Sequence, residues 1–112
     1  METLCRTVGA LAMLAVLQVS HADDKKISQA TQFLKDACVT SGSSLDLKVT
    51  ANGELQVRRL LGTGVQGSVT LTKKELQGFA DSASALSAQQ ATEMRNCMKP
   101  YIDKILNVIL SQ

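Results

Sequence analysis

The sequence predicts an α+β fold: a three-stranded antiparallel meander with an N-terminal helix and one or two C-terminal helices on one face, in the order α-β-β-β-α-α. Three observations support this prediction. Apolar residues recur at helical spacing near the start and at the end of the chain, and they alternate with polar residues in the middle. Short stretches rich in glycine, serine and asparagine separate these segments. Strands joined by short connections pair as antiparallel neighbours and bury their apolar face under helices.

Residues 1–22 have the features of a secretory signal peptide. The apolar run from Val8 to Val19 is shorter than the about 20 residues that a membrane-spanning helix needs. Ser20 and Ala22 stand three and one residues before the expected cut, where signal peptidases accept small side chains. We therefore expect a secreted or periplasmic protein, with residues 23–112 as a single small domain. The alternatives are an uncleaved membrane anchor and a buried helix.

Two cysteines remain after the expected cleavage, because Cys5 belongs to the leader. In a small exported domain, an even number of cysteines predicts a disulfide, here between Cys38 and Cys97. Closing so long a loop stabilises a domain by about 2–4 kcal/mol. Two free thiols or a bridge between chains are the alternatives. The spacing does not fit a C-x-x-C redox motif, and two sulfurs without a histidine make a poor zinc site.

The first helix is expected over residues 26–38. Its apolar positions follow the helical repeat: Ile27, Ala30, Leu34, Ala37 and Cys38. The stretch TSGSS at residues 40–44 then ends the helix.

Alternating residues predict a hairpin over residues 45–57. A two-residue turn at Asn52 and Gly53 would place Val49 opposite Gln56, which mixes apolar and polar side chains on one face. A three-residue loop over residues 51–53 sorts the faces and gives these pairs: Val49 with Leu55, Leu47 with Val57, Asp46 with Arg58 and Lys48 with Gln56. We therefore expect the longer loop, with Gly53 in the left-handed conformation.

The stretch GTGVQG at residues 62–67 matches the glycine pattern of nucleotide-binding loops. In a dinucleotide-binding fold this loop leads from a strand into a helix. Here it follows a strand that ends near Leu61, a further alternating segment begins at Val69, and helix signals begin only at Thr72. The chain also lacks the V-A-I-K, H-R-D and D-F-G motifs of protein kinases. We expect a flexible turn that binds no nucleotide, with a glycine tip that can contact a partner.

Two capping boxes predict the starts of two later helices. Thr72 with Glu75 begins a helix whose apolar face is formed by Leu76, Phe79, Ala80 and Ala83. Ser87 with Gln90 indicates a second start, and apolar residues then recur to Ile109. Pro100 lies within this last segment, so it either kinks the helix or begins a new one.

The composition argues against an enzyme. The only histidine, His21, belongs to the expected leader, so no imidazole remains for general-base catalysis or metal binding. No serine has a lysine three residues later, and nothing in the sequence brings two carboxylates into a cleft. We expect no catalytic residue, no metal and no cofactor.

Nucleic acid is also an improbable partner. The net charge is only +2, and acidic residues are interspersed among the basic ones. The expected mature chain has no tryptophan and three aromatic residues, Phe33, Phe79 and Tyr101, which is too few for a base-stacking platform. We expect membrane contact only through the leader.

By elimination, we expect a non-catalytic binding or inhibitory module that contacts an unknown protein. Its contacts would come from the polar face of the sheet and from the glycine tip: Lys48, Arg58, Thr63, Gly64, Val65 and Gln66. One alternative is a structural subunit of an envelope assembly that forms a homodimer through its C-terminal helix, because residues 105–110 are apolar around the helix. Another is a carrier of a small apolar ligand held between helix and sheet.

Overall fold

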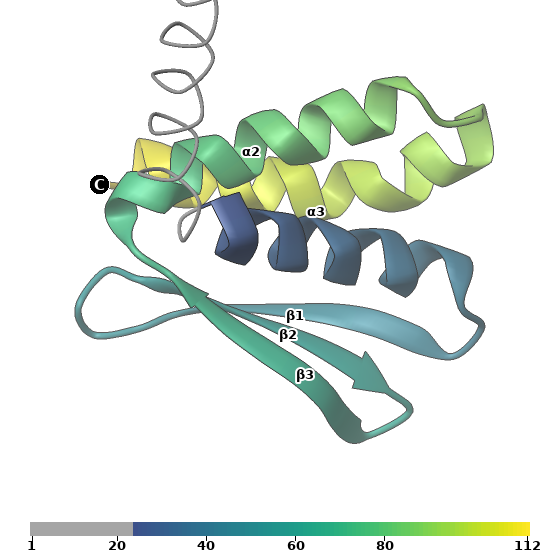
Figure 1. The fold of residues 1–112 in the computed structure, drawn as a ribbon, viewed down its shortest axis with the longest axis horizontal. Helices are drawn as coiled ribbons and strands as arrows, with labels where there is room; N and C mark the ends of the chain where they lie inside the picture. The colour runs from purple at the N-terminus through teal and green to yellow at the C-terminus, as the bar shows by residue number, and fades with distance from the viewer. Residues whose placement is uncertain (1–23) are drawn as a thin grey trace, which may run out of the picture.

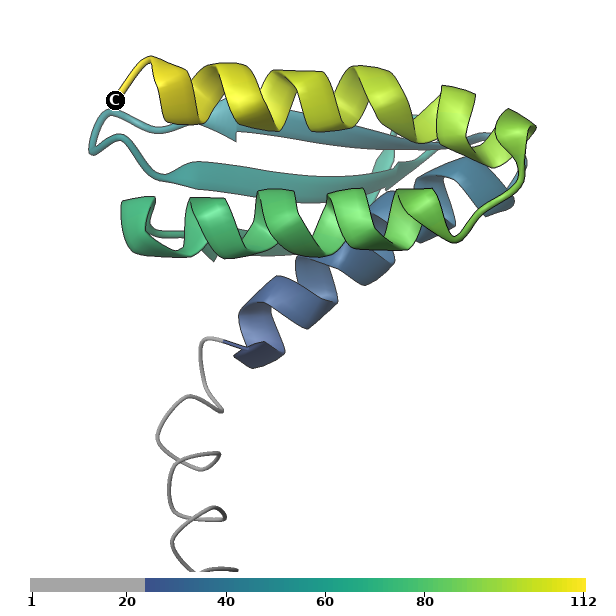
Figure 2. The ribbon, with the colours of Figure 1, turned by 90° about the horizontal axis from the view of Figure 1, so that it is seen from above.

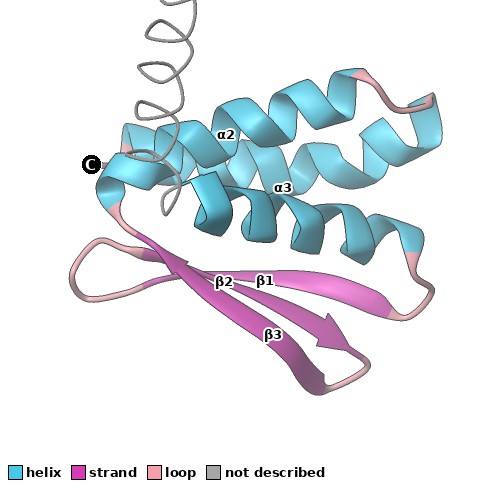
Figure 3. Cartoon of the chain, viewed as in Figure 1, coloured by secondary structure: helices cyan, strands magenta, loops and turns pink. Residues whose placement is uncertain are grey.

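The computed structural model describes residues 24–112 and shows two layers, with three helices on one face of a three-stranded antiparallel sheet (Figure 1). Residues 24–39 form the N-terminal helix. The other elements follow in the order β1 (Ser43–Val49), β2 (Leu55–Leu61), β3 (Gly64–Leu71), α2 (Lys73–Ala88) and α3 (Thr92–Leu110) (Figure 3). The predicted α+β class and element order are confirmed. The predicted leader, residues 1–22, lies outside the described residues.

The first hairpin has the predicted register. β1 and β2 make all four expected pairs, including Asp46 opposite Arg58 and Leu47 opposite Val57. The Thr50 amide donates to the Glu54 carbonyl over 2.8 Å, and Gly53 has a φ of 80°, in the left-handed region. The three-residue loop over residues 51–53 is therefore confirmed. Val49 differs from its inward-facing neighbours, because it ends an edge strand and stays exposed.

The second turn is much tighter than predicted. β3 already begins at Gly64, so only Gly62 and Thr63 form the turn, and Gly62 has a φ of 60°. Leu60 pairs with Val65 and Arg59 pairs with Gly67, which leaves Gln66 as the extra residue of a β-bulge. The prediction of a flexible loop over residues 62–67 was wrong. The bulge shifts the alternation of inward and outward side chains by one residue, so the sequence pattern does not reveal that the strand begins at Gly64.

The bulge brings Gly67 to the inner face of the sheet, under Phe33 of the N-terminal helix. A Cβ added to Gly67 would lie 2.8 Å from Cζ of Phe33, closer than a real contact allows. Gly67 therefore permits the helix to approach the sheet closely at this point.

The core lies between the inner face of the sheet and the helices. Its largest fully buried side chains come from β2, β3 and all three helices: Leu34, Leu55, Val57, Leu71, Leu76, Phe79, Met98 and Ile105. α3 lies along β1, and α2 runs beside α3 (Figure 2). The predicted disulfide joins Cys38 of the N-terminal helix to Cys97 of α3, 59 positions apart along the chain and with 5.8 Å between their Cα atoms.

The first of the two predicted capping boxes is confirmed, and the second is not. Glu75 Oε1 accepts hydrogen bonds from the amide of Thr72 over 2.8 Å and from its hydroxyl over 3.0 Å. Ser87 instead lies in the last turn of α2, where its carbonyl accepts from the amide of Gln90 over 3.0 Å. Gln90 thus follows Gln89, the C-cap of α2, rather than capping the next helix, and α3 begins at Thr92 after Ala91 as its N-cap.

Pro100 lies inside α3, which the structure assigns as one helix from Thr92 to Leu110. Pro100 neither ends nor restarts the helix. The proline is on the exposed side, as is Asn96 four residues earlier, whose carbonyl loses its intrahelical donor. A solvent-facing carbonyl can bind water instead, so the helix tolerates the missing amide.

Candidate functional site

No described element covers the outer face of the sheet, because all three helices pack on the opposite face (Figure 1). The register assigns nine residues to this outer side, and we call them the open face: Ser44, Asp46, Lys48, Gln56, Arg58, Leu60, Val65, Ser68 and Thr70. Antiparallel sheets often leave one face solvated in this way. A polar open face can therefore be part of an ordinary fold. Whether it can bind a partner depends on which of its charges are unpaired and which of its apolar side chains are exposed.

Some charged side chains of the open face form ion pairs and others do not. Arg58 donates to Asp46 Oδ2 through Nε over 2.9 Å and also through Nη2, so these two side chains neutralise each other across the strands. Both are partly exposed, and such pairs contribute about 1 kcal/mol or less to stability. Lys48 is exposed and forms no ion pair with the described residues. Of the two cations predicted for partner contact, Lys48 is the one that remains free to meet an acidic group.

The end of the β2–β3 hairpin, residues 60–66, carries apolar side chains into solvent, and we call it the hairpin tip. Figure 1 shows this turn at the end of the sheet farthest from α2 and α3. Val65 is 51% exposed and Leu61 is 43% exposed. Val65 was among the predicted contact residues, but Leu60 and Leu61 were not, because both were assigned to the end of a strand. The missed signal is the absence of any charged residue between Arg59 and Lys73.

The predicted contact residues lie along one strip rather than in one cluster. Lys48 is level with Gln56 and Thr70 near the first turn, Arg58 is level with Ser68, and Val65 is level with Leu60 near the second turn. At about 3.4 Å per residue, the rows of Lys48 and Val65 are separated by roughly 14 Å along β2. A partner that touched both would have to follow the length of the sheet.

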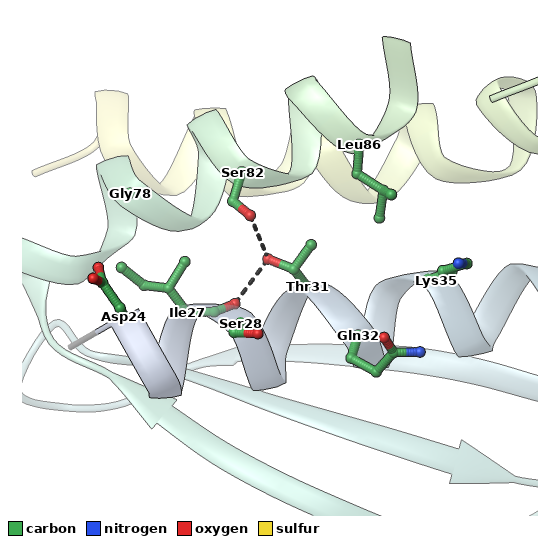
Figure 4. A pocket seen from close by; sticks show the side chains of 9 residues that line it. All are labelled: Asp24, Ile27, Ser28, Thr31, Gln32, Lys35, Gly78, Ser82 and Leu86. Carbon is green, nitrogen blue, oxygen red and sulfur yellow. Dashed lines mark hydrogen bonds between the residues drawn. The ribbon is translucent and has the colours of Figure 1, made fainter. Parts of the chain in front are cut away.

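A groove of about 480 Å³ lies on the helical side, between the N-terminal helix and α2 (Figure 4). At its base Thr31 donates to the carbonyl of Ile27 over 2.8 Å and lies 3.0 Å from the hydroxyl of Ser82. Ile27 packs on Gly78, where an added Cβ would lie 2.6 Å from its side chain. These residues hold the two helices together, so the polar groups of the groove already have a structural use.

A second groove of about 430 Å³ lies between α2 and α3, and its lining combines apolar and polar residues: Ser84, Ser87, Ala88, Thr92, Arg95, Asn96, Lys99 and Ile102. Within residues 24–112, no group of three or more histidine, cysteine or acidic side chains is placed to hold a metal ion. Over the same residues, no helix is both long enough and apolar enough to cross a membrane.

Glu75 is the one buried acidic side chain among the described residues. Besides the bonds from Thr72, its Oε1 accepts a hydrogen bond from Lys26 Nζ over 2.8 Å. Burial tends to raise the pKa of Glu75, but the hydrogen bonds from Lys26 and Thr72 and the charge of Lys26 together hold it below the ordinary value. This cluster joins the N-terminal helix to the start of α2, and we assign it to stability.

Comparison of the chain with protein-family models, with curated proteins and with solved structures gives no match. A function must therefore be argued from the surfaces themselves.

Proposed function

We propose that this chain is a small, non-catalytic binding or inhibitory module that acts outside the cell or in the periplasm and contacts a protein through its open face and hairpin tip. The observation that carries this proposal is the 51% exposure of Val65 at the end of the open face, which no described element covers. Leu61 adds a second exposed apolar side chain at the same hairpin tip, on the other side of the sheet. Exposed apolar groups rimmed by polar ones are typical of protein contacts. The Cys38–Cys97 disulfide is compatible with an oxidising compartment.

Lys48 gives the open face a preference for a partner with an acidic group. Since Arg58 is neutralised by Asp46, the free cation of the open face is Lys48. A partner surface with an apolar contact for Val65 and an acidic group near Lys48 would match both ends of the strip.

The test is capture of a partner by the oxidised protein from the extracellular or envelope fraction of its source, followed by binding measurements with variants. Val65→Ser and Lys48→Ala should each weaken binding by about fivefold to tenfold. Leu110→Ser and Lys104→Ala are the matched controls, since they make the same changes at exposed positions on α3. Unchanged binding by Val65→Ser and Lys48→Ala, with loss in the α3 variants, would contradict the proposal.

Those controls also examine the alternative of a homodimer formed through α3. Ile105 and Val108 are buried, so the C-terminal segment is less evenly apolar outside than its sequence suggests. Leu106 and Leu110 nevertheless remain 39% and 82% exposed one turn apart. Concentration-dependent dimerisation that Leu110→Ser removes would favour this alternative. The carrier of an apolar ligand stays a prediction, since both described grooves lie between helices rather than between helix and sheet.

A further inference from the structure

The two edges of the sheet are protected to different degrees. On β1, the ladder with β2 leaves the Leu45 amide pointing outward, and this amide donates to the hydroxyl of Tyr101 over 3.4 Å. α3 lies along this strand, and β1 also carries Asp46 and Lys48. Charged side chains and covering elements are the usual means by which proteins prevent an edge strand from pairing. The β1 edge is therefore the better protected of the two.

The β3 edge lacks most of these protections. Because Val57 pairs with Val69 and Leu55 with Leu71 in the alternating antiparallel pattern, the backbone groups of Ser68 and Thr70 point away from β2. Neither backbone amide donates to a partner within residues 24–112. β3 contains no charged residue and no proline, and its bulge lies near the turn, so residues 67–71 remain a regular edge.

The helix above β3 limits what can pair with this edge. Phe33 rests on Gly67, so the N-terminal helix lies over β3. If β3 paired with β3 of a second copy, the two strands would be about 4.8 Å apart, and the two helices would meet at a similar spacing. Packed helices need about 8–10 Å between their axes. A single added strand brings no second helix and avoids this collision.

The surroundings define the chemistry of such a strand. Its side chains on the helical side would face the half-buried ring of Phe33 and should be apolar, while those on the other side would join Ser68 and Thr70 and should be polar. Lys74, three residues after the end of β3, is exposed and forms no ion pair with described residues, whereas the Lys73 side chain lies at Gly53 in the β1–β2 turn. Together with the positive end of α2, Lys74 favours an acidic residue at the neighbouring end of the added strand.

We propose that the β3 edge binds an extended segment of a partner protein as a fourth, antiparallel strand, with alternating apolar and polar residues and an acidic residue near its N-terminal end. This inference rests on the proposed binding function and names the kind of partner and the contact that it makes. Backbone hydrogen bonds to Ser68 and Thr70 would supply much of the affinity, and Phe33 and Lys74 would supply the selectivity.

The experiment selects phage-displayed random linear peptides of about eight residues, the length of a long strand, on the oxidised protein. We expect enriched peptides with the stated alternation and an acidic residue near the N-terminus. Peptide binding should slow hydrogen exchange of the Ser68 and Thr70 amides. Ser68→Pro removes one edge amide and should weaken these peptides about tenfold or more, whereas Ser68→Ala should not. Gly67 precedes the new proline, so the substitution meets little steric conflict.

Failure to enrich such peptides, or enriched peptides that leave both amides exchanging as before, would overturn the strand proposal. Peptides that Lys48→Ala weakens and Ser68→Pro leaves unaffected would also overturn it, while they would support binding by the open face. If Ser68→Pro does not fold, the exchange of the Ser68 and Thr70 amides in the unsubstituted protein decides the question by itself.

Discussion

Replacement of Gly67 by alanine tests the contact that holds the N-terminal helix on the sheet. The new Cβ would lie 2.8 Å from Cζ and 3.2 Å from Cε1 of Phe33, so the ring or the helix must move. The helix has little freedom, because Cys38 bonds to Cys97 in α3 and Asp36 pairs with Arg59 at 3.4 Å. Overpacking of this kind costs about 1–3 kcal/mol. For a domain of this size, each 1 kcal/mol lowers the melting temperature by roughly 4–8 °C.

Gly64→Ala is the matched control. Gly64 lies in the same strand with no positive φ, and its added Cβ would meet nothing closer than 3.6 Å. Its stability should stay the same or rise by about 0.4–1 kcal/mol, because alanine reduces the entropy of the unfolded chain. Phe33→Leu should remove much of the added cost of Gly67→Ala, since the two residues touch and their effects cannot be additive.

Urea unfolding of the oxidised proteins, followed by circular dichroism, measures these differences in the free energy of unfolding. The comparison holds if the variants have the same m-value as the parent protein. Equal midpoints for Gly67→Ala and Gly64→Ala would refute the reasoning, and so would purely additive effects of Gly67→Ala and Phe33→Leu. Either result would mean that Phe33 does not rest on Gly67.

Three further predictions concern stability. Because the pKa of Glu75 is lowered in the folded state, the ionised Glu75 side chain adds to the free energy of unfolding above its unfolded pKa of about 4.3, and this stabilisation is lost as the pH falls through the folded pKa. Glu75→Gln should therefore make the melting temperature fall less steeply in this acidic range. An unchanged slope would contradict the assigned shift. Cys97→Ser should lower the free energy of unfolding by about 2–4 kcal/mol, and alkylation followed by mass spectrometry should find no free thiol at Cys38 in the oxidised parent protein. Thr31→Ala should cost about 1 kcal/mol in denaturant titrations by removing the hydroxyl between the two helices, whereas Ser28→Ala, at an exposed position in the same groove, should cost nearly nothing.

The register of the first hairpin could be predicted because its constraint is local and periodic. A shift of one residue would move every apolar side chain of the strand to the other face. Only the three-residue loop placed Leu47 beside Val57 and Asp46 beside Arg58, and the structure has both pairs. The first capping box was predictable because it needs specific residue types three positions apart. The disulfide was predictable because only two cysteines remain after the expected leader.

Predictions were wrong where contacts between distant residues control the local structure. The bulge at Gln66 has no local signature, and it becomes visible only once β2 is paired with β3. The pattern at Ser87 and Gln90 matches a capping box, yet α2 continues through Ser87 to Ala88. Of the two alternatives left open at Pro100, the start of a new helix is excluded, since α3 runs through it from Thr92 to Leu110.

The candidate surface was predicted in part. Alternation was enough to place Lys48 and Arg58 on the outer side of the sheet, and the sequence also set Asp46 opposite Arg58. The exposure of Leu61 was not predicted, because an apolar residue at the end of a strand looks the same whether a helix covers it or not.

Sequence alone thus determined the class of fold, the order of its elements, the first hairpin and the disulfide partners, because periodicity, turn chemistry and cysteine count are properties of short segments or of composition. Tertiary structure alone decided that Phe33 rests on Gly67, that Tyr101 accepts the Leu45 amide on one edge of the sheet, and that the edge at Ser68 stays open. Each of these depends on where a helix packs against a strand, and that position follows from the fit of the whole core rather than from any local pattern.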